Sequence, residues 1–389
     1  MNQARPIKIM QVIARMNVGG PAVIVTELMR GLDPAKFQVV LMTGFCAGDE
    51  ADYLDEAAQD IPVTRISGLG RSVSAIDDIR SLFTLIRLIR EYKPDIIHTH
   101  TAKAGVLGRV AGLIACPSAK RVHTYHGHLL HGYFTARKTQ IVIAIEKLLA
   151  TFSAALIAIG NQVRDDLLAV RIGKVKKYSV IFPGLDKLDS QSKSSAKDEL
   201  GLEQDKTYIV FVGRLTQIKR PDRLIEIARH LKVKHPLVEL LIAGAGEKFV
   251  EIQELAKNES LPMVFLGWRN DIGRILSASN IALLCSDNEG IPLTLIQASQ
   301  VGLPIVSTNV GSVGDIVKDS ETGILTEANS NSLIHAIDDL LSNPEKMARF
   351  GQGGKERAEV LFSLQGMINA HEDLYSQVIE KKIKSILVK

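Results

Sequence analysis

The sequence from position 208 reads Tyr208-Ile209-Val210-Phe211-Val212-Gly213-Arg214-Leu215-Thr216-Gln217-Ile218-Lys219-Arg220-Pro221. Its five leading apolar residues predict a buried strand, and the amphipathic segment 221–231 predicts a helix. Arg214 and Lys219 therefore lie where a strand ends and a helix begins, which is where an open α/β sheet binds ligands. A guanidinium grips oxygens in a fork and an ammonium acts as a point charge, so the pair suits a diphosphate.

A second element of the same kind follows later in the chain, Ser286-Asp287-Asn288-Glu289-Gly290-Ile291-Pro292-Leu293-Thr294. Pro292 suits a first helical turn, and the N–H groups of Leu293 and Thr294 at that helix terminus would favour phosphate. Glu289 repels a phosphate unless it serves a nearby hydroxyl group, and a sugar attached to the diphosphate would account for it. Taken singly, the two cations can also be a solvated surface pair and Glu289 a turn residue.

Strand-like and helix-like runs alternate along the chain, and such alternation specifies parallel sheets with right-handed crossovers. We expect strands at 8–13, 37–42, 96–98, 122–125, 154–159, 179–182, 208–212, 238–242, 264–266, 281–284, 305–307 and 324–325. The polar, serine-rich segment 188–197 is predicted to be a linker. The prediction is an α/β protein of two doubly wound domains, residues 1–187 and 188–362, with a C-terminal helix at 363–389.

Composition is that of a water-soluble globular protein, because 46% of the 389 residues are apolar and 23% are charged. The three cysteines are widely spaced, which favours free thiols in a reducing compartment and hence the cytoplasm. The N-terminus lacks the apolar core of a signal peptide. The most apolar stretch, 141–159, is interrupted by charges and is predicted to be a buried helix followed by a buried strand.

Charge is distributed unevenly, since residues up to Ser190 carry a surplus of about seven positive charges while the remainder is slightly acidic. Arg137, Lys138 and Lys147, near Tyr133 and Phe134, suggest contact with an anionic membrane surface; an ordinary solvated helix face is the alternative. Nucleic acid is not an expected partner, because the basic residues are dispersed and form no recognised binding motif.

Further polar residues mark strand ends in the first half. The pair Gly19-Gly20 follows the first strand without the Gly-x-Gly-x-x-Gly spacing of dinucleotide-dependent dehydrogenases, although paired glycines let a backbone approach a ligand closely. Four histidines lie together at 123, 126, 128 and 131, but no cysteine or carboxylate is near enough to complete a zinc site. His98 and His100 are expected to be structural. No metal and no cofactor are predicted.

In combination these motifs resemble the glycosyltransferases of family 4 (glycosyl transferases group 1), which have the GT-B fold of two Rossmann-like domains facing across a cleft. The likeness rests on Gly-Arg-Leu-x-x-x-Lys from Gly213, on Glu-Gly-x-Pro from Glu289, on the loop 16–20, and on the pattern of Phe362, Ser363, Met367 and Tyr375. It covers nearly the whole chain. Such a protein moves a sugar from a nucleoside diphosphate, and the terminal helix crosses back to the first domain.

The resemblance also implies site residues. His126 would face the donor sugar near the reacting centre, so the catalytic candidates are Arg214, Lys219, His126 and Glu289. The candidates for donor and nucleotide binding are Gly19, Gly20, Gly213, Gly244, Gly246, Trp268, Arg269, Gly290, Ile291, Pro292, Leu293, Thr294 and Gln297. The family places a second glutamate, which holds the ribose hydroxyls, where this chain has Gln297. An amide lacks the charge that strengthens such contacts.

The sequence thus predicts a metal-independent, retaining glycosyltransferase that transfers a hexose or N-acetylhexosamine, most simply from UDP, to a glycan or lipid-linked acceptor in polysaccharide or glycolipid synthesis. Two alternatives remain at this point. A sugar-nucleotide epimerase of the same fold would use a single substrate, and a non-catalytic relative would bind nucleotide without turnover, as Gln297 makes conceivable.

Overall fold

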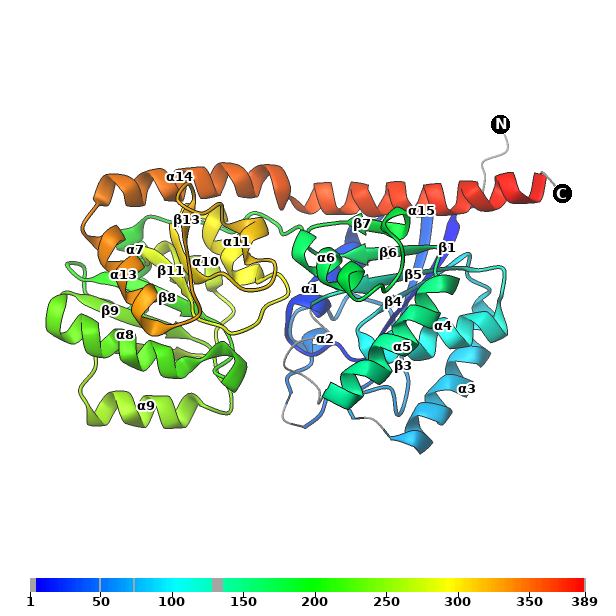
Figure 1. Ribbon diagram of the computed structural model, residues 1–389, viewed down its shortest axis with the longest axis horizontal. Coiled ribbons are helices and arrows are strands. Elements are labelled where there is room, and N and C mark those ends of the chain that lie inside the picture. The colour runs from blue at the N-terminus through cyan, green and yellow to red at the C-terminus, as the bar shows by residue number, and fades with distance from the viewer. Residues whose placement is uncertain (1–4, 49, 73, 128–135, 388–389) are drawn as a thin grey trace. The chain divides into compact units, whose positions relative to one another are not determined.

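The computed structural model describes residues 5–48, 50–72, 74–127 and 136–387. The chain divides into two compact units, one comprising Met1–Gly184 with Leu364–Lys389 and the other Leu185–Ser363. Each unit contains one parallel sheet with helices on both faces (Figure 1). The expected α/β fold of two doubly wound sheets is confirmed.

The first sheet has seven strands in the order β3-β2-β1-β4-β5-β6-β7. Its strands are β1 (Ile7–Ile13), β2 (Phe37–Thr43), β3 (Val63–Arg65), β4 (Ile96–His100), β5 (Lys120–Tyr125), β6 (Ala155–Ala158) and β7 (Tyr178–Val180). Its helices are α1 (Gly20–Gly31), α2 (Tyr53–Glu56), α3 (Ala75–Tyr92), α4 (Ala102–Ala115), α5 (Ala136–Phe152), α6 (Asn161–Ala169) and α15 (Leu364–Leu387), with the short 3-10 turn η1 (Val175–Lys177).

Side-chain alternation along β1 divides the core of this unit in two. Ile9 packs on one face with Leu28 of α1 and Tyr375 of α15, whereas Met10 packs on the other with Leu85 of α3. Both faces are covered by helices, which is why β1 is apolar along nearly its whole length. Helix α15, red in Figure 1, comes from the end of the chain and completes a core that the first strand begins.

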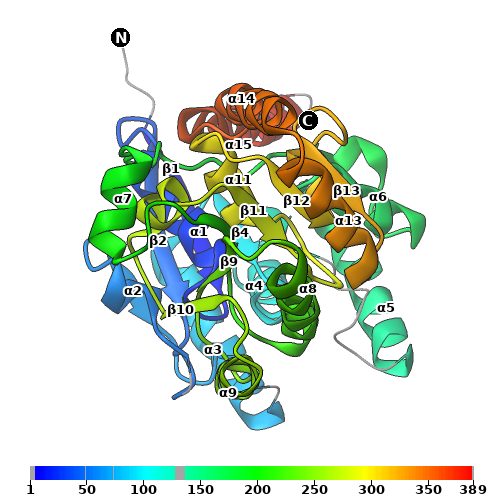
Figure 2. The ribbon, with the colours of Figure 1, turned by 90° about the vertical axis from the view of Figure 1, so that its left-hand side faces the viewer.

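The second sheet has six strands in the order β10-β9-β8-β11-β12-β13. Its strands are β8 (Thr207–Val212), β9 (Val238–Ala243), β10 (Met263–Gly267), β11 (Ile281–Leu284), β12 (Ile305–Thr308) and β13 (Gly323–Thr326). Its helices are α7 (Lys193–Leu200), α8 (Pro221–Lys234), α9 (Phe249–Asn258), α10 (Ile272–Ser277), α11 (Leu293–Gln300), α12 (Val313–Ile316), α13 (Ser330–Leu341) and α14 (Pro344–Leu361), with the 3-10 turn η2 (Gln217–Lys219). Helices α8 and α13 lie side by side over one face (Figure 2).

Two predictions about local structure are wrong. The serine-rich segment predicted as a linker is helical from Lys193 as α7, because the Ser192 side chain accepts a hydrogen bond from the Ser195 N–H and caps the helix. The apolar stretch that begins at Ile141 is not a buried helix. Helix α5 turns Ile141, Ile145 and Leu148 to solvent, while Ile143 and Ala150 on the opposite side are buried.

The short strand β3 was not predicted, because three residues at a sheet edge carry too little apolar pattern. None of the described helices is long and apolar enough to cross a bilayer.

Candidate functional site

The strand order of the second sheet locates a candidate site. Strands β8 and β11 are neighbours, but the chain leaves them toward opposite edges of the sheet, and ligands of doubly wound folds bind where the order reverses in this way. The loop after β8 carries Arg214 and Lys219, and the loop after β11 carries Glu289 and Pro292. The two segments singled out in the sequence therefore meet at one switch point.

Hydrogen bonds join these two loops. The Asp287 N–H donates to the Ile218 carbonyl over 2.9 Å, and the Cys285 thiol donates to the Lys219 carbonyl over 3.2 Å. The Lys219 ammonium donates to Glu289 Oε1, to which Ser286 Oγ also donates over 2.6 Å. Each loop therefore fixes the other, and Glu289 is neutralised by an ion pair.

The two cations differ in their surroundings. The Arg214 side chain is exposed and has no hydrogen bond or ion pair within the described part of the chain, so its five donors are available to a ligand. The Lys219 side chain is partly buried and is oriented by Glu289. The sequence predicts that Glu289 serves a hydroxyl group. One of its oxygens already accepts from two donors, so its other oxygen is the one available to a sugar hydroxyl.

Helix α11 begins one residue later than predicted, since Pro292 is its N-cap and does not belong to the first turn. The N–H groups of Leu293 and Thr294 belong to that turn and so lack acceptors within the helix. The Ser312 N–H donates to the Gly290 carbonyl over 2.9 Å and holds the loop ahead of the helix. Gln297 lies one turn further along α11 and is partly exposed.

The glycines after β9 have a packing role of their own. Gly244 and Gly246 have φ values of 146° and 147°, which side-chain-bearing residues rarely adopt. A Cβ on Gly244 would come within 1.9 Å of the Gly213 carbonyl oxygen, and one on Gly246 within 2.6 Å of the Leu215 carbonyl oxygen. These glycines let the β9 loop lie directly against the loop that carries Arg214.

Trp268 and Arg269 follow β10 at the same edge of the sheet. About half of Trp268 is exposed, so its ring is accessible to a flat partner. The Arg269 guanidinium is engaged by Asp271 through Nε and Nη2 at 2.7 and 2.5 Å. Contact between Arg269 and a ligand would therefore use its backbone or displace Asp271.

The first sheet has a switch point between β1 and β4. Gly19 is the N-cap of α1, Gly20 is its first residue and Pro21 lies in its first turn, so the paired glycines lie at the start of this helix.

A network of largely buried polar side chains lies beside that point. His126 Nε2 lies 2.9 Å from His100 Nδ1, whose ring contacts Gln11 through its other nitrogen. His98 contacts Tyr375 of α15 and Thr124 at 2.7 Å each. His98 and His100 are thus buried and hydrogen-bonded. His128 and His131, and with them Tyr133 and Phe134, lie outside the described residues.

Burial governs the ionisation of these rings. It lowers the pKa of His98 and His100 well below the ordinary value and that of His126 to about 3, and the neighbouring histidines act in the same direction. All three are therefore neutral near pH 7. Sequence reasoning missed Gln11, although a glutamine inside the apolar strand β1 was a usable signal, and it gave Tyr375 no place near these histidines.

One group of described residues has the geometry of a metal site: His230 and His235 at the end of α8, and Asp338 of α13. Lys234 donates to Asp338 over 2.6 Å and supplies the positive charge there. Helix α8 begins at the switch point of the second sheet and is 14 residues long, so its far end lies about 20 Å from the loops that carry Arg214 and Glu289.

Comparison with known proteins identifies the family of the chain. Residues 18–187 match Glycosyltransferase Family 4 and residues 192–357 match Glycosyl transferases group 1. The chain is 32% identical to the UDP-Gal:alpha-D-GlcNAc-diphosphoundecaprenol alpha-1,3-galactosyltransferase of Escherichia coli, covering 76% of this chain and 79% of the relative. This chain belongs to the family 4 glycosyltransferases.

Other relatives agree with this assignment. The capsular polysaccharide biosynthesis glycosyltransferase CapM of Staphylococcus aureus is 24% identical over 85% of this chain and 87% of its own length. Among solved structures, Anabaena HepE in complex with UDP has a TM-score of 0.80 at 20% identity and covers 95% of this chain and 100% of its own. The GT-B fold of this glycosyltransferase is therefore confirmed.

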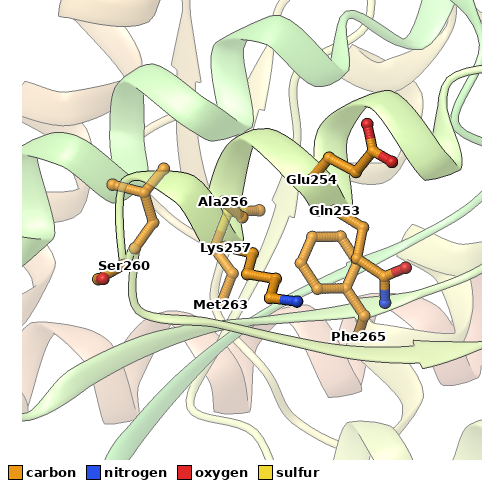
Figure 3. Close-up of a pocket in the computed structure, with 8 residues that line it drawn as sticks. Gln253, Glu254, Ala256, Lys257, Ser260, Met263 and Phe265 are labelled. Carbon is orange, nitrogen blue, oxygen red and sulfur yellow. The ribbon is translucent and has the colours of Figure 1, made fainter.

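The pocket drawn in Figure 3 is a separate feature of the glycosyltransferase. It lies between α9 and β10 and is lined by Gln253, Lys257, Ser260 and Phe265, among others. None of the predicted site residues lines it. We therefore do not assign it to the donor.

Proposed function

We propose that the protein transfers a hexose or N-acetylhexosamine from a UDP-sugar, with retention of configuration and without a metal, to a glycan or lipid-linked acceptor in polysaccharide or glycolipid synthesis. The observation that carries the proposal is the meeting of two cations and a helix N-terminus at one switch point. Donors aimed at developing negative charge are a large source of transition-state stabilisation.

In the proposed reaction Arg214, Lys219 and the first turn of α11 stabilise the departing diphosphate. The chemistry needs no divalent ion, because these groups supply positive charge and N–H donors. The diphosphate oxygen would take the acceptor hydroxyl proton on the face from which it leaves, which gives retention. His126 and Glu289 would contact the sugar, and Gln297 the ribose.

The names of the relatives suggest the substrates. The Escherichia coli relative uses UDP-galactose and an acceptor carried on a polyprenyl diphosphate, and HepE has been solved with UDP. We therefore propose UDP-hexoses as donors and polyprenyl-diphosphate-linked sugars as the first acceptor class. The enzyme would act at the cytoplasmic face of the membrane.

Ligand stabilisation tests the donor. A ligand at 100 times its Kd should stabilise the folded state by about 2.7 kcal/mol, so a thermal-shift screen of UDP-galactose, UDP-glucose, UDP-N-acetylglucosamine and GDP-mannose should single out one UDP-sugar. Incubation of that donor with a polyprenyl-diphosphate-linked acceptor should give an α-linked product by NMR. An epimerised nucleotide sugar formed without acceptor would contradict the transferase assignment for this donor.

Helix α5 supports contact with an anionic membrane. Ile141, Ile145, Leu148 and Phe152 recur every three or four residues, so they form one stripe, and between 38% and 61% of each is exposed. Arg137, Lys138 and Lys147 are the exposed charges of this helix, while its only acidic residue, Glu146, is buried. An apolar stripe flanked by cations suits an anionic bilayer surface.

Vesicle sedimentation tests this surface. The protein should bind phosphatidylcholine vesicles that contain phosphatidylglycerol more strongly than vesicles of phosphatidylcholine alone, and Ile141→Ser with Leu148→Ser should reduce binding at least about tenfold, since each removes apolar area worth over 1 kcal/mol. Val233→Ser with Val360→Ser, at exposed helix positions of the second unit, is the matched control. Equal binding by both double variants would contradict the assignment.

A further inference from the structure

Three side chains of the first unit, Gln11, His100 and His126, form a continuous chain of hydrogen bonds. His100 Nε2 lies 2.6 Å from Gln11 Oε1, and His100 Nδ1 lies 2.9 Å from His126 Nε2. The remaining ring nitrogen, His126 Nδ1, is buried and has no hydrogen-bond partner in the described structure. Gln11 and His100 are both 0% exposed, so water does not compete for these contacts.

The protons in this chain follow from Gln11. An amide oxygen can only accept, so His100 must carry its proton on Nε2. A neutral His100 then has a bare Nδ1, which can only accept, so His126 carries its proton on Nε2. A neutral His126 is left with a bare Nδ1, which is a hydrogen-bond acceptor.

The Gln11 amide lies with its nitrogen toward Tyr375 and its oxygen toward His100. Gln11 Nε2 donates to the Tyr375 hydroxyl oxygen over 3.2 Å, and that hydroxyl lies 2.7 Å from His98 Nδ1. The hydroxyl proton therefore goes to His98, whose Nε2–H donates to Thr124 Oγ1 over 2.7 Å. The reversed amide would reverse every donor in the network and place a proton on His126 Nδ1.

We propose that Gln11 is a positioning residue that keeps His126 Nδ1 unprotonated, so that this nitrogen accepts a hydrogen bond from a sugar hydroxyl during transfer. A buried acceptor without a partner is costly, and a hydroxyl donor would satisfy it. The inference rests on the proposed function. It explains why a polar residue stands inside β1 and why its partner is supplied by the last helix of the chain.

Nitrogen NMR of the histidine rings tests the inference without a substrate. In the wild type His126 should show an unprotonated Nδ1 and a protonated Nε2. In Gln11→Leu, His100 loses the acceptor for its Nε2 proton, so a protonated Nδ1 should appear at His126. A protonated Nδ1 at His126 in the wild type would overturn the proposal, and so would an unchanged spectrum in Gln11→Leu.

Activity supplies a second readout. Gln11→Leu should lower turnover at least about tenfold while UDP affinity stays within twofold of wild type, because one acceptor to the sugar is lost and the second unit is untouched. Thr99→Val is the control: it removes the 2.8 Å contact to the buried His123, which lies outside this chain of hydrogen bonds, and should leave turnover unchanged. Equal losses in both variants would indicate a merely structural role.

The pH profile of Gln11→Glu separates positioning from packing. The carboxylate keeps the acceptor at His100 but raises the pKa of His100 and His126, which among the described titratable groups interact with His98, His123 and His371. As pH falls His100 becomes cationic and donates from Nδ1, so His126 changes tautomer. Turnover of Gln11→Glu should therefore fall from about pH 8 to about pH 6, while wild type stays level. Parallel pH profiles of wild type and Gln11→Glu would refute the proposal that Gln11 sets the His126 tautomer. If UDP does not stabilise the wild-type protein, only the proposed function is refuted.

Discussion

The ammonium of Lys219 donates to the Glu289 carboxylate, 70 residues further along the chain. One residue follows β8 and the other follows β11, so this ion pair closes the switch point of the second sheet. It also removes the difficulty of a carboxylate beside a predicted phosphate site. Lys219 is oriented before a ligand arrives, whereas Arg214 has no such partner among the described residues and must be ordered by the ligand.

Arg214→Ala and Lys219→Ala should each lower turnover by at least about a hundredfold, since a donor to developing negative charge is lost. Arg229→Ala, which removes an exposed cation paired with Glu259 on the same unit, is the control and should retain full activity. Steady-state kinetics with the identified donor measures the effect. Near-wild-type turnover of both site variants would rule out the diphosphate assignment.

Glu289→Gln should lower kcat/KM for the UDP-sugar by about tenfold or more, because Lys219 loses the charge that orients it and the sugar loses an acceptor. UDP affinity should not fall, since a negative charge near the diphosphate is removed. Ser286→Ala removes only a hydrogen bond to Glu289 and should have a smaller effect. Isothermal titration measures UDP affinity and steady-state kinetics measures kcat/KM, so together they separate the effect on nucleotide binding from the effect on transfer. Weaker UDP binding in Glu289→Gln would contradict this prediction.

Gln297→Glu should tighten UDP binding by about 1 kcal/mol if this side chain reaches the ribose, because a charge-assisted hydrogen bond replaces a neutral one. Repulsion of the diphosphate opposes the gain, and the neutralised Glu289 adds little to that repulsion. Isothermal titration calorimetry of UDP binding to the wild type and to Gln297→Glu measures the difference in affinity. An unchanged affinity that is already micromolar would show that Gln297 does not touch the nucleotide.

Treatment with EDTA should leave transfer activity unchanged, because Arg214, Lys219 and α11 are proposed to supply the positive charge at the leaving group. The assay compares EDTA-treated protein with the same protein after dialysis into Mg²⁺ or Mn²⁺. Activity that is lost and then restored by a divalent ion would contradict the metal-independent mechanism.

Acid should destabilise the first unit in a defined pH range. Burial lowers the pKa of His98, His100, His123, His126 and His371, so these groups stay neutral in the folded state and gain protons on unfolding. The stabilisation is complete above the unfolded pKa of about 6.5 and is lost as pH falls, by about 1.4 kcal/mol per pH unit for each proton taken up.

Urea denaturation at pH 7 and pH 5 measures this loss. His371→Gln should give a shallower dependence by about one proton, because the pKa of His371 is lowered to about 4 in the folded state. Equal unfolding free energies at the two pH values would show that the histidines are protonated in the native protein.

Sequence reasoning was most successful where one local pattern determined structure. The run Tyr208–Val212 with Arg214 and Lys219 predicted a strand end that the structure places at the switch point, since a buried parallel strand needs continuous apolar residues. It was less successful where a helix cap determined the secondary structure or where tertiary packing determined which side chains are exposed. The segment capped by Ser192 is helical, although its composition predicted a linker. Helix α5 exposes an apolar face that the sequence analysis assigned to the core.

The candidate site shows the same limit. Arg214 and Glu289 could be selected because their residue types suit the chemistry and their positions follow strands, whereas the role of His126 came from the resemblance to the family. Gln11 and Tyr375 could not be paired in advance, because they are 364 positions apart and only the packing of α15 against β1 brings them into contact. The roles of the selected residues toward a ligand remain predictions.

The return of α15 to the first core has a consequence for synthesis on the ribosome. Tyr375 is fully buried beside residues of β1 and α1, yet the whole of Leu185–Ser363 must be translated before it emerges. At roughly 5–20 residues per second, the nascent first unit waits on the order of ten seconds or more with that part of its apolar surface uncovered. The second unit is contiguous in sequence and can complete its core while the first is still unfinished, so the order of folding need not follow the order of synthesis.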